Sequence, residues 1–301
     1  MEKTIVELFA GVGGFRLAFE NHLKWETLWA NQWEPSKKNQ FAYNCYIKNF
    51  SSHNAINEDI SNIDKKSIPT HTLLVGGFPC QDYSVARTKA QGIAGKKGVL
   101  WWQISAIIKA KKPPFILLEN VDRLLKSPST KRGRDFGIML RNLNDLGYGL
   151  EWRVVNAGEY GFAQRRRRVF IFCFNKKTNY HKFIKNSTPE DVFNKDGIFT
   201  KSFPITKLDT STIKSTGIVK NFEDLVDISE NFSFLFENSG YMVNGIIHTS
   251  KTIPKKIKFI ALEDIIKADE NYIYIYDTEV DRPIRTSREH NRVFLDDIET
   301  D

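Results

Sequence analysis

One ten-residue stretch most restricts how this chain can fold. Residues 72–75 are apolar or β-branched, and Gly-Gly-Phe leads from them to Pro79 and Cys80. The pattern predicts a buried parallel strand that ends in a tight turn and presents one thiol at its carboxyl edge. Ligands of open α/β sheets collect at that edge, so Cys80 is a candidate nucleophile. The alternative is a small buried hydrophobe, as free cysteines often are.

Length, charge and cysteine content set broad limits. The 301 residues suit one large or two modest domains, and an apolar fraction of 41% suffices for a core. A net charge of +8 and a pI of about 9.2 suit a polyanionic partner or ordinary solubility equally well. Three cysteines without paired spacing argue against disulfides and a cysteine metal site. With no signal peptide or bilayer-spanning run, we expect a cytoplasmic protein without membrane contact.

The amino-terminal segment predicts the opening βα unit of a nucleotide-binding fold. A strand over residues 4–9 precedes a glycine turn at 10–14 and a helix over 15–23. The turn lacks the dinucleotide fingerprint, so NAD is not favoured. A second strand leads to Trp33 and Glu34. An acid at this position usually holds a ribose, which makes Glu34 a candidate. The Trp33 ring either covers an adenine or simply packs against the protein.

The next predicted elements flank the thiol turn. A helix over residues 36–50 is expected to place Phe41, Cys45 and Tyr46 on its inner face. Asp59 either accepts from an adenine amino group or is a solvated loop acid. Residues 87–98 are rich in glycine and cations, which predicts a basic loop able to close over a substrate. A helix over residues 100–110 follows.

A carboxylate and an arginine run come next. Glu119 directly follows the apolar strand 115–118, where burial is costly unless an ion pair, a helix cap or a catalytic role compensates. After a helix at 135–146 and a strand at 152–156, four arginines enter the strand 169–174. If that strand alternates, Arg166 and Arg168 share one face, and Arg165 and Arg167 share the other.

Beyond residue 175 the β/α alternation fades. Residues 237–245 predict a hairpin, residues 258–268 a short helix and residues 272–276 a strand. We find no internal repeat.

Four segments in this order resemble the motifs of DNA (cytosine-5) methyltransferases, especially those of bacterial restriction–modification systems. They are ELFAGVGGF at 7–15, GFPCQ at 77–81, ENV at 119–121 and QRRRRV at 164–169. The resemblance implies an α/β fold: a Rossmann-like, S-adenosylmethionine-dependent methyltransferase sheet with helices on both faces. It further implies a catalytic and cofactor-binding domain over residues 1–175 and a smaller, partial target-recognition region over 176–301.

The resemblance also implies roles for single residues, and no metal. Cys80 is the expected nucleophile, Glu119 the partner of the cytosine ring, and Arg166 and Arg168 hold the site. Expected cofactor contacts are Phe9, Gly11, Val12, Gly13, Gly14, Trp33, Glu34, Asp59, Ile60, Pro79 and Leu100. Expected DNA contacts are Gln81, Ser84, Arg87, Lys89, Lys96, Gln164 and Arg165. The family usually has Glu where this chain has Gln32, so Glu34 is expected to replace it or the ribose contact to be weaker.

The implied reaction is methylation of C5 of a flipped-out cytosine in double-stranded DNA, with a cognate restriction endonuclease acting on the same site. We find no counterpart of the family's final motif, whose helix packs under the cofactor site. One alternative is therefore a cofactor- and DNA-binding half that needs a partner chain. Another is an RNA cytosine-5 methyltransferase, and a nicotinamide dehydrogenase is least favoured.

Overall fold

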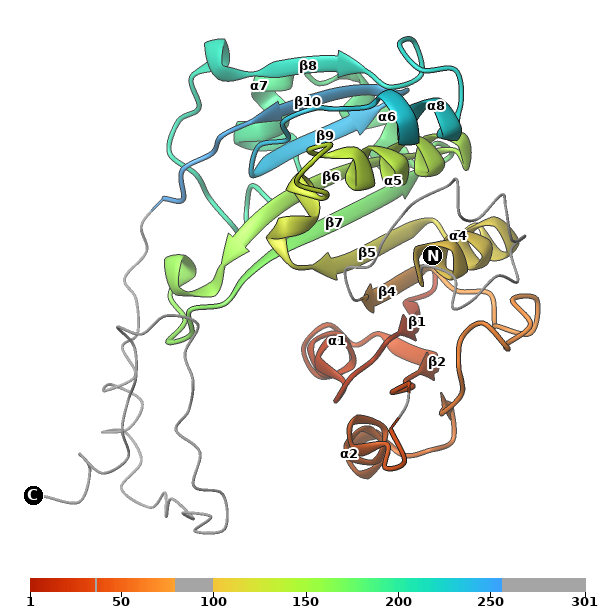
Figure 1. Cartoon of the computed structure of the whole chain (residues 1–301). Helices are drawn as coiled ribbons and strands as arrows, with labels where there is room; N and C mark the ends of the chain where they lie inside the picture. Colours follow the sequence, from red (N-terminus) through yellow and green to blue (C-terminus); the bar gives the residue numbers. More distant parts are fainter. Residues whose placement is uncertain (36, 79–99, 256–301) are drawn as a thin grey trace, which may run out of the picture. The chain divides into compact units, whose positions relative to one another are not determined.

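A mixed β-sheet of ten strands organises the described part of the chain (Figure 1). The computed structural model describes residues 1–35, 37–78 and 100–255, all within the first of two units, Met1–Phe259. The strand order is β3-β2-β1-β4-β5-β7-β6-β9-β10-β8. Neighbours from β3 to β5 pair in parallel, and from β5 through β7 to β8 every pairing is antiparallel. This agrees with the predicted Rossmann-like sheet.

The elements have the following bounds. The strands are β1 (Thr4–Leu8), β2 (Glu26–Asn31), β3 (Ala55–Ile56), β4 (Leu73–Gly77), β5 (Phe115–Asn120), β6 (Tyr148–Asn156), β7 (Arg167–Asn175), β8 (Lys214–Gly217), β9 (Ser239–Val243) and β10 (Ile246–Ser250). The α-helices are α1 (Gly14–Arg16), α2 (Phe41–Phe50), α4 (Leu100–Lys111), α5 (Arg134–Asp145), α6 (Asn179–Asn186), α7 (Pro189–Asp191) and α8 (Leu225–Asn231). A π-helix, η1 (Leu17–His22), continues α1, and η4 (Val192–Asp196) continues α7. Single 3₁₀ turns are η2 (Asp122–Lys126), η3 (Ala157–Tyr160) and η5 (Thr210–Thr212).

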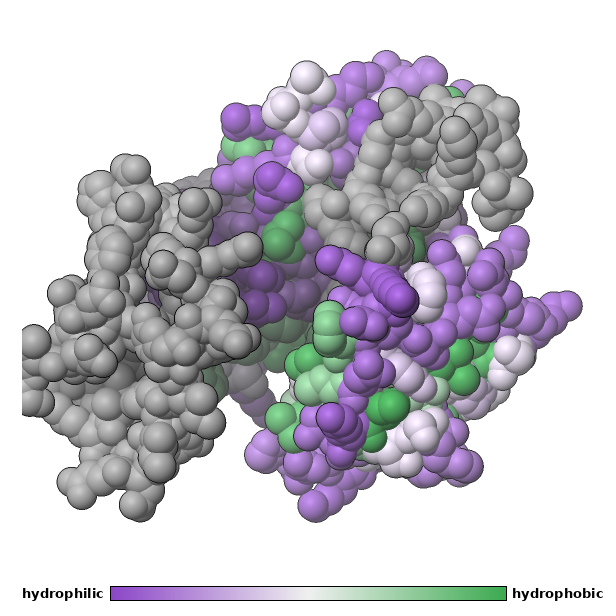
Figure 2. Space-filling view, turned by 60° about the horizontal axis from the view of Figure 1, so that its bottom comes forward, coloured by the Kyte–Doolittle hydropathy of each residue, from purple (hydrophilic) through white to green (hydrophobic). Residues whose placement is uncertain are grey.

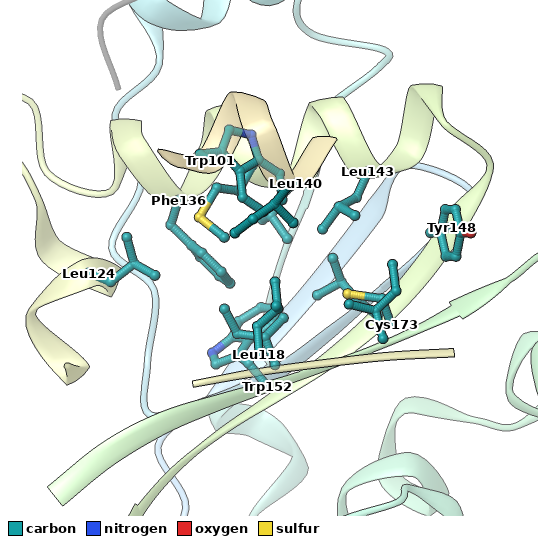
Figure 3. Packing of buried hydrophobic residues seen from close by; sticks show 14 of the residues in the cluster. Trp101, Leu118, Leu124, Phe136, Leu140, Leu143, Tyr148, Trp152 and Cys173 are labelled. Atoms are coloured by element: carbon teal, nitrogen blue, oxygen red, sulfur yellow. The ribbon is translucent and has the colours of Figure 1, made fainter. Parts of the chain in front are cut away.

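The largest hydrophobic core lies between the sheet and helices α4 and α5. Figure 3 shows Trp101 of α4 and Phe136 and Leu140 of α5 above the side chains of Leu118 and Trp152 from the strands. All five are at most 1% exposed. Burying side chains of this size contributes roughly 1.5–3 kcal/mol each. The cluster therefore holds β5 and its neighbours firmly against the helices.

One edge of the sheet gathers the polar strand ends. The carboxyl ends of β1, β2, β4 and β5 meet there because these strands are parallel. Strand β7 runs the other way, so its first residues lie at the same edge. In the β5–β7 register Glu119 is opposite Phe170 and Asn120 is opposite Val169. The sheet thus brings the arginine run beside the carboxylate, although some 45 residues separate them.

The inner face predicted for α2 is wrong in part. The helix begins at Phe41 rather than near residue 36, since the Gln40 side chain ties the preceding loop by bonds to the backbone of Glu34 and Lys37. Tyr46 is buried as expected, but Phe41 is 70% exposed and Cys45 is also exposed. Phe41 and Cys45 are four residues apart, so they share the outer face of the helix.

The region beyond residue 175 extends the sheet. The predicted hairpin is confirmed: β9 and β10 pair with Asn244 and Gly245 at the turn. Strand β9 also pairs with β6, and β8 completes the sheet. The domain boundary at residue 175 stays a prediction. The predicted loop 87–98, helix 258–268 and strand 272–276 lie outside the described residues. Within the described ranges no helix has the length and apolarity needed to cross a membrane.

Candidate active site

Glu119 is held by two arginines at the polar edge of the sheet. Its Oε1 atom lies 2.7 Å from Nε of Arg168 and 3.7 Å from Nη2 of Arg166. Arg167 turns the other way and pairs with Asp122, with Nε and Oδ2 2.7 Å apart. The predicted sharing of one face by Arg166 and Arg168 is therefore confirmed. The Glu119 side chain keeps 20% exposure, so the paired carboxylate still reaches solvent.

The second carboxylate oxygen of Glu119 faces the strand that leads to the thiol. A Cβ atom built on Gly77 would lie 3.0 Å from Glu119 Oε2. This close approach explains a glycine at position 77, since a side chain there would push the carboxylate away. Gly77 precedes Cys80 by three residues, and Cys80 itself lies outside the described residues. The acid is thus placed at the exit of the strand that precedes the candidate nucleophile in the sequence.

Asn120 is a site residue that the sequence reasoning missed. Its side chain is 2% exposed and donates from Nδ2 to the carbonyl oxygen of Phe78 at 2.8 Å. Its Oδ1 accepts from the backbone N–H of Val121 at 2.8 Å. An amide at the end of a buried strand needs hydrogen-bond partners, and this need was the available signal. Asn120 joins the strand bearing Glu119 to the turn that precedes Cys80.

The glycine turn forms the other part of the site. Phe9 and Gly11 have positive φ angles of 52° and 57°. No atom lies within 4 Å of a Cβ built on Gly11 or on Gly14, so open space adjoins the backbone there. The side-chain Oε1 of Gln32 accepts from the Gly11 N–H at 2.7 Å. Open space at a helix start, fixed by a neighbouring strand end, fits a small polar ligand such as S-adenosylmethionine.

A buried carboxylate lies beneath this turn and was not predicted as a site residue. Glu7 of β1 is fully buried and accepts from the Tyr46 hydroxyl, with Oε2 and Oη 3.0 Å apart. Arg16 of α1 donates to the same hydroxyl at 3.3 Å. Burial raises the pKa of Glu7 to about 7 despite these bonds. The network fastens α1 and α2 to β1 below the glycines.

Other predicted cofactor residues are engaged in local structure. Glu34 Oε2 accepts from the Ala42 N–H at the start of α2 at 3.1 Å. Asp59 Oδ1 accepts from the Ser61 N–H at 2.9 Å, and Ile60 is 2% exposed within the core. Trp33 is 38% exposed and available for a ligand. Val12 is 59% exposed, and Leu100 begins α4 against the core. Their cofactor roles stay predictions.

The predicted nucleic-acid contacts are only partly described. Gln164 and Arg165 are exposed beside Arg166. Pro79, Cys80, Gln81, Ser84, Arg87, Lys89 and Lys96 lie outside the described residues. Over residues 1–35, 37–78 and 100–255, no group of three or more His, Cys, Asp or Glu side chains could hold a metal ion.

Comparison with protein families identifies the chain. The model of the C-5 cytosine-specific DNA methylases matches residues 3–294. The chain belongs to this family. Its members take their methyl group from S-adenosylmethionine, the cofactor that the glycine turn was predicted to hold. The predicted family and fold class are therefore confirmed.

Individual relatives support the assignment. The type II methyltransferase M.Sau3AI of Staphylococcus aureus is 52% identical over 272 residues, which cover 88% of this chain and 65% of that protein. M.SsoII of Shigella sonnei is 37% identical, covering 62% of this chain and 46% of that protein. M.HhaI of Haemophilus parahaemolyticus is 34% identical, covering 59% of this chain and 51% of that protein. The chain thus spans between about half and two thirds of the length of these relatives.

A search of solved structures gives weaker matches. A variant of the DNMT2 of Spodoptera frugiperda aligns with a TM-score of 0.47 and 19% identity, covering 59% of this chain and 51% of that one.

Proposed function

We propose that this methylase transfers a methyl group from S-adenosylmethionine to C5 of a flipped-out cytosine in duplex DNA, through a covalent bond between Cys80 and C6. The observation that carries the proposal is the placement of Glu119. Two arginines hold one oxygen of its carboxylate, and the other oxygen faces Gly77, three residues before Cys80.

The chemistry requires these side chains. C5 of cytosine is a poor nucleophile, and attack of the Cys80 thiolate on C6 would turn C5 into an enamine carbon. Negative charge then builds on N3 and O2 of the ring. A protonated Glu119 would donate to N3, and a guanidinium of Arg166 or Arg168 would stabilise the charge at O2. Once C5 has taken the methyl group, loss of the C5 proton to a base and expulsion of Cys80 would restore the ring double bond and the free thiolate.

The cofactor site supports the same proposal. S-adenosylmethionine, when bound, supplies an electrophilic methyl group. The open space at Gly11 and Gly14 would accept it, and the half-exposed Trp33 ring would lie on its adenine. Gln32 holds the turn through the Gly11 N–H. The side chains of this region thus bind and orient the donor.

The substrate follows from the geometry of DNA. C6 of a paired cytosine cannot be reached inside a stacked duplex, so the base must leave the helix before Cys80 can attack. Exposed Gln164 and Arg165 adjoin the active-site arginines and would contact the phosphate backbone. Hydrophilic residues cover much of the face in Figure 2, with smaller hydrophobic groups between them.

Covalent trapping tests the proposal. Duplex DNA with 5-fluorocytosine at the target position, incubated with S-adenosylmethionine, should form a denaturation-resistant adduct because the C5 fluorine cannot leave as a proton does. Cys80→Ser should form none. Cys45→Ser is the matched control, since Cys45 is an exposed thiol on α2, and should trap like the wild type. An adduct with Cys80→Ser would refute the assignment of the nucleophile.

A second chain is a further candidate partner. Leu17 is 50% exposed and lines a hollow with Asn49 and Phe50 beside the glycine turn. We propose that the family's final motif, supplied by a separate chain, packs its helix here. Adding that chain should raise the methyl-transfer rate of the wild type. Leu17→Asp should abolish the increase, whereas Leu235→Asp, which changes a residue 45% exposed elsewhere, should preserve it.

Two details of the substrate and its biology belong to the same proposal. A competition between duplex DNA and structured RNA distinguishes DNA methylation from RNA methylation, and we expect DNA alone to suppress transfer to labelled DNA. Equal competition by RNA would favour RNA as the substrate.

A cognate restriction endonuclease should fail to cleave DNA that this methylase has treated.

A further inference from the structure

The loop that joins β6 to β7 lies between η3 and the start of β7 (Figure 1) and carries an aromatic residue. Phe162 in this loop is 64% exposed. Gln164 and Arg165 follow it and are exposed, and the Arg166 side chain is 52% exposed. Single exposed apolar side chains are common on protein surfaces, so the feature that sets Phe162 apart is its place beside the exposed cations of the active-site edge.

The structure of the loop holds this ring outside. The Ala157 N–H donates to the Arg166 carbonyl at 3.0 Å, which closes the base of the loop. The Phe162 N–H donates back to the Ala157 carbonyl at 3.2 Å. Gly161 has a φ of 91°, a turn that L-residues rarely adopt. The loop is therefore ordered around Phe162.

A buried neighbour anchors the loop from below. Tyr160 is 7% exposed, and its ring packs edge-on against Phe203 with the centroids 5.1 Å apart. Tyr160 points into the protein while Phe162, two residues later, points out. A loop backbone fixed in this way loses little conformational freedom when a partner covers Phe162, which favours binding.

The position of the loop indicates the partner. Arg166 closes the loop and also reaches the Glu119 carboxylate, so Phe162 lies four residues from a group of the active site. Cations beside an aromatic ring suit nucleic acid, because the cations meet phosphates while the ring stacks on a base. A protein partner would explain the ring but would give no reason for the adjacent arginines.

We infer that Phe162 stacks on a nucleobase next to the target cytosine. The inference rests on the proposed DNA methylation. Removing the cytosine from the duplex leaves its neighbours without one stacking partner, and a flat side chain can cover the exposed base. Phe162 thereby stabilises the complex in which the base is flipped out.

The test uses the full-length chain. Bisulfite sequencing of plasmid DNA methylated by the wild type first identifies the target sequence, and short duplexes containing it are then the probe. The variants are Phe162→Ala, Phe162→Leu, Phe162→Trp and the control Phe183→Ala. Phe183 is 50% exposed on α6, which follows the opposite end of β7 (Figure 1).

Loss of the ring should weaken DNA binding selectively. We expect Phe162→Ala to raise the Kd for the duplex by about 5-fold to 100-fold, as loss of one stacked base does. The Kd of Phe162→Leu for the duplex should lie between those of the wild type and Phe162→Ala. Phe162→Trp should bind the duplex like the wild type, and the duplex should quench the fluorescence of the new tryptophan. Phe183→Ala should match the wild type. The melting temperature and the Kd for S-adenosylhomocysteine should not change in any variant.

Three results would overturn the inference. A Phe162→Ala duplex Kd within twofold of the wild-type value, with the wild type active, refutes it and leaves the proposed function intact. Weaker binding of a second protein chain with unchanged DNA binding identifies a protein contact instead. If the wild type neither methylates DNA nor forms the fluorocytosine adduct, the proposed function and the stacking role both fail.

Discussion

The side-chain amide of Asn120 donates a hydrogen bond to the backbone carbonyl of Phe78, with Nδ2 and O 2.8 Å apart. The bond is buried and joins the end of β5 to the residue that follows β4. Glu119 immediately precedes Asn120, and Cys80 comes two residues after Phe78 in the sequence. One short contact therefore fixes the strand that carries the acid against the last described residue before the thiol.

Replacing Asn120 should slow catalysis more than it weakens cofactor binding. We expect Asn120→Ala to lower the single-turnover methyl-transfer rate about 10-fold to 100-fold, because misplacement of a reacting group by about 1 Å costs about that much. The Kd for S-adenosylhomocysteine should change little. Asn142→Ala on α5 is the control, since Asn142 is also buried but belongs to a helix in the core. A wild-type rate in folded Asn120→Ala would contradict the positioning role.

Adjacent arginines of β7 should differ sharply. Arg168 bonds Glu119 and Arg167 bonds Asp122, each with 2.7 Å between the paired atoms. We expect Arg168→Ala to lower kcat about 10²-fold to 10³-fold, the range found when a charge-stabilising donor is removed. Arg167→Ala should lose less than about 1 kcal/mol of stability, since its ion pair with Asp122 is exposed, and it should keep a kcat near that of the wild type. Steady-state methylation by both variants measures the difference in kcat. Equal losses of kcat would argue against a role for the Glu119 pair.

Restoring the family's acid at position 32 should strengthen cofactor binding. A Gln32→Glu carboxylate can still accept from the Gly11 N–H, and its other oxygen can accept from a ribose hydroxyl. We expect the Kd for S-adenosylmethionine to fall about 10-fold or more, since a charged hydrogen bond adds roughly 1.5 kcal/mol or more. Gln32→Leu leaves the Gly11 N–H without this partner and should weaken binding. Calorimetric titration checks both variants, and weaker binding by Gln32→Glu would contradict the ribose contact.

A buried acid should make stability depend on pH. Glu151 of β6 is 4% exposed, accepts from the Tyr180 hydroxyl at 2.5 Å and from the Ile198 N–H at 2.9 Å, and lies near Arg153. Burial raises the pKa of Glu151 to about 7, so the folded protein holds this proton more tightly than the unfolded chain does. Its contribution to stability is therefore greatest at about pH 4.5 and falls as the pH rises to about 7.

Glu151→Gln removes this titration and keeps both contacts, because the amide can donate to Tyr180 Oη and accept from the Ile198 N–H. Relative to the wild type, the variant should gain up to about 3 kcal/mol of unfolding free energy between pH 4.5 and 7. Urea unfolding at several pH values measures this difference. Burial also raises the pKa of Glu7, but Glu7 titrates in both proteins and its contribution cancels in the comparison. A pH-independent difference would contradict the raised pKa.

Local patterns predicted the elements around the site well. Helix α4, strand β5 and the hairpin of β9 and β10 lie close to where apolar spacing and turn residues placed them. The prediction for α2 was wrong in its first residue and in part of its inner face. The Gln40 side chain bonds the backbone of Glu34 and Lys37 ahead of the helix. Packing buries Tyr46 and leaves Phe41 and Cys45 exposed, and apolar spacing alone does not distinguish these two neighbouring faces.

The sequence alone predicted which residues carry the chemistry, and it determined that Arg166 and Arg168 share one face of the chain. The separation of Arg166 and Arg168 from Arg167 is a property of any extended backbone, because successive side chains point to opposite faces. The tertiary structure decided the partners: Glu119 for Arg166 and Arg168, Asp122 for Arg167, Phe78 for Asn120 and Gly11 for Gln32. Those pairings depend on which strands lie side by side, and that order follows from burial of the whole apolar core rather than from any local pattern.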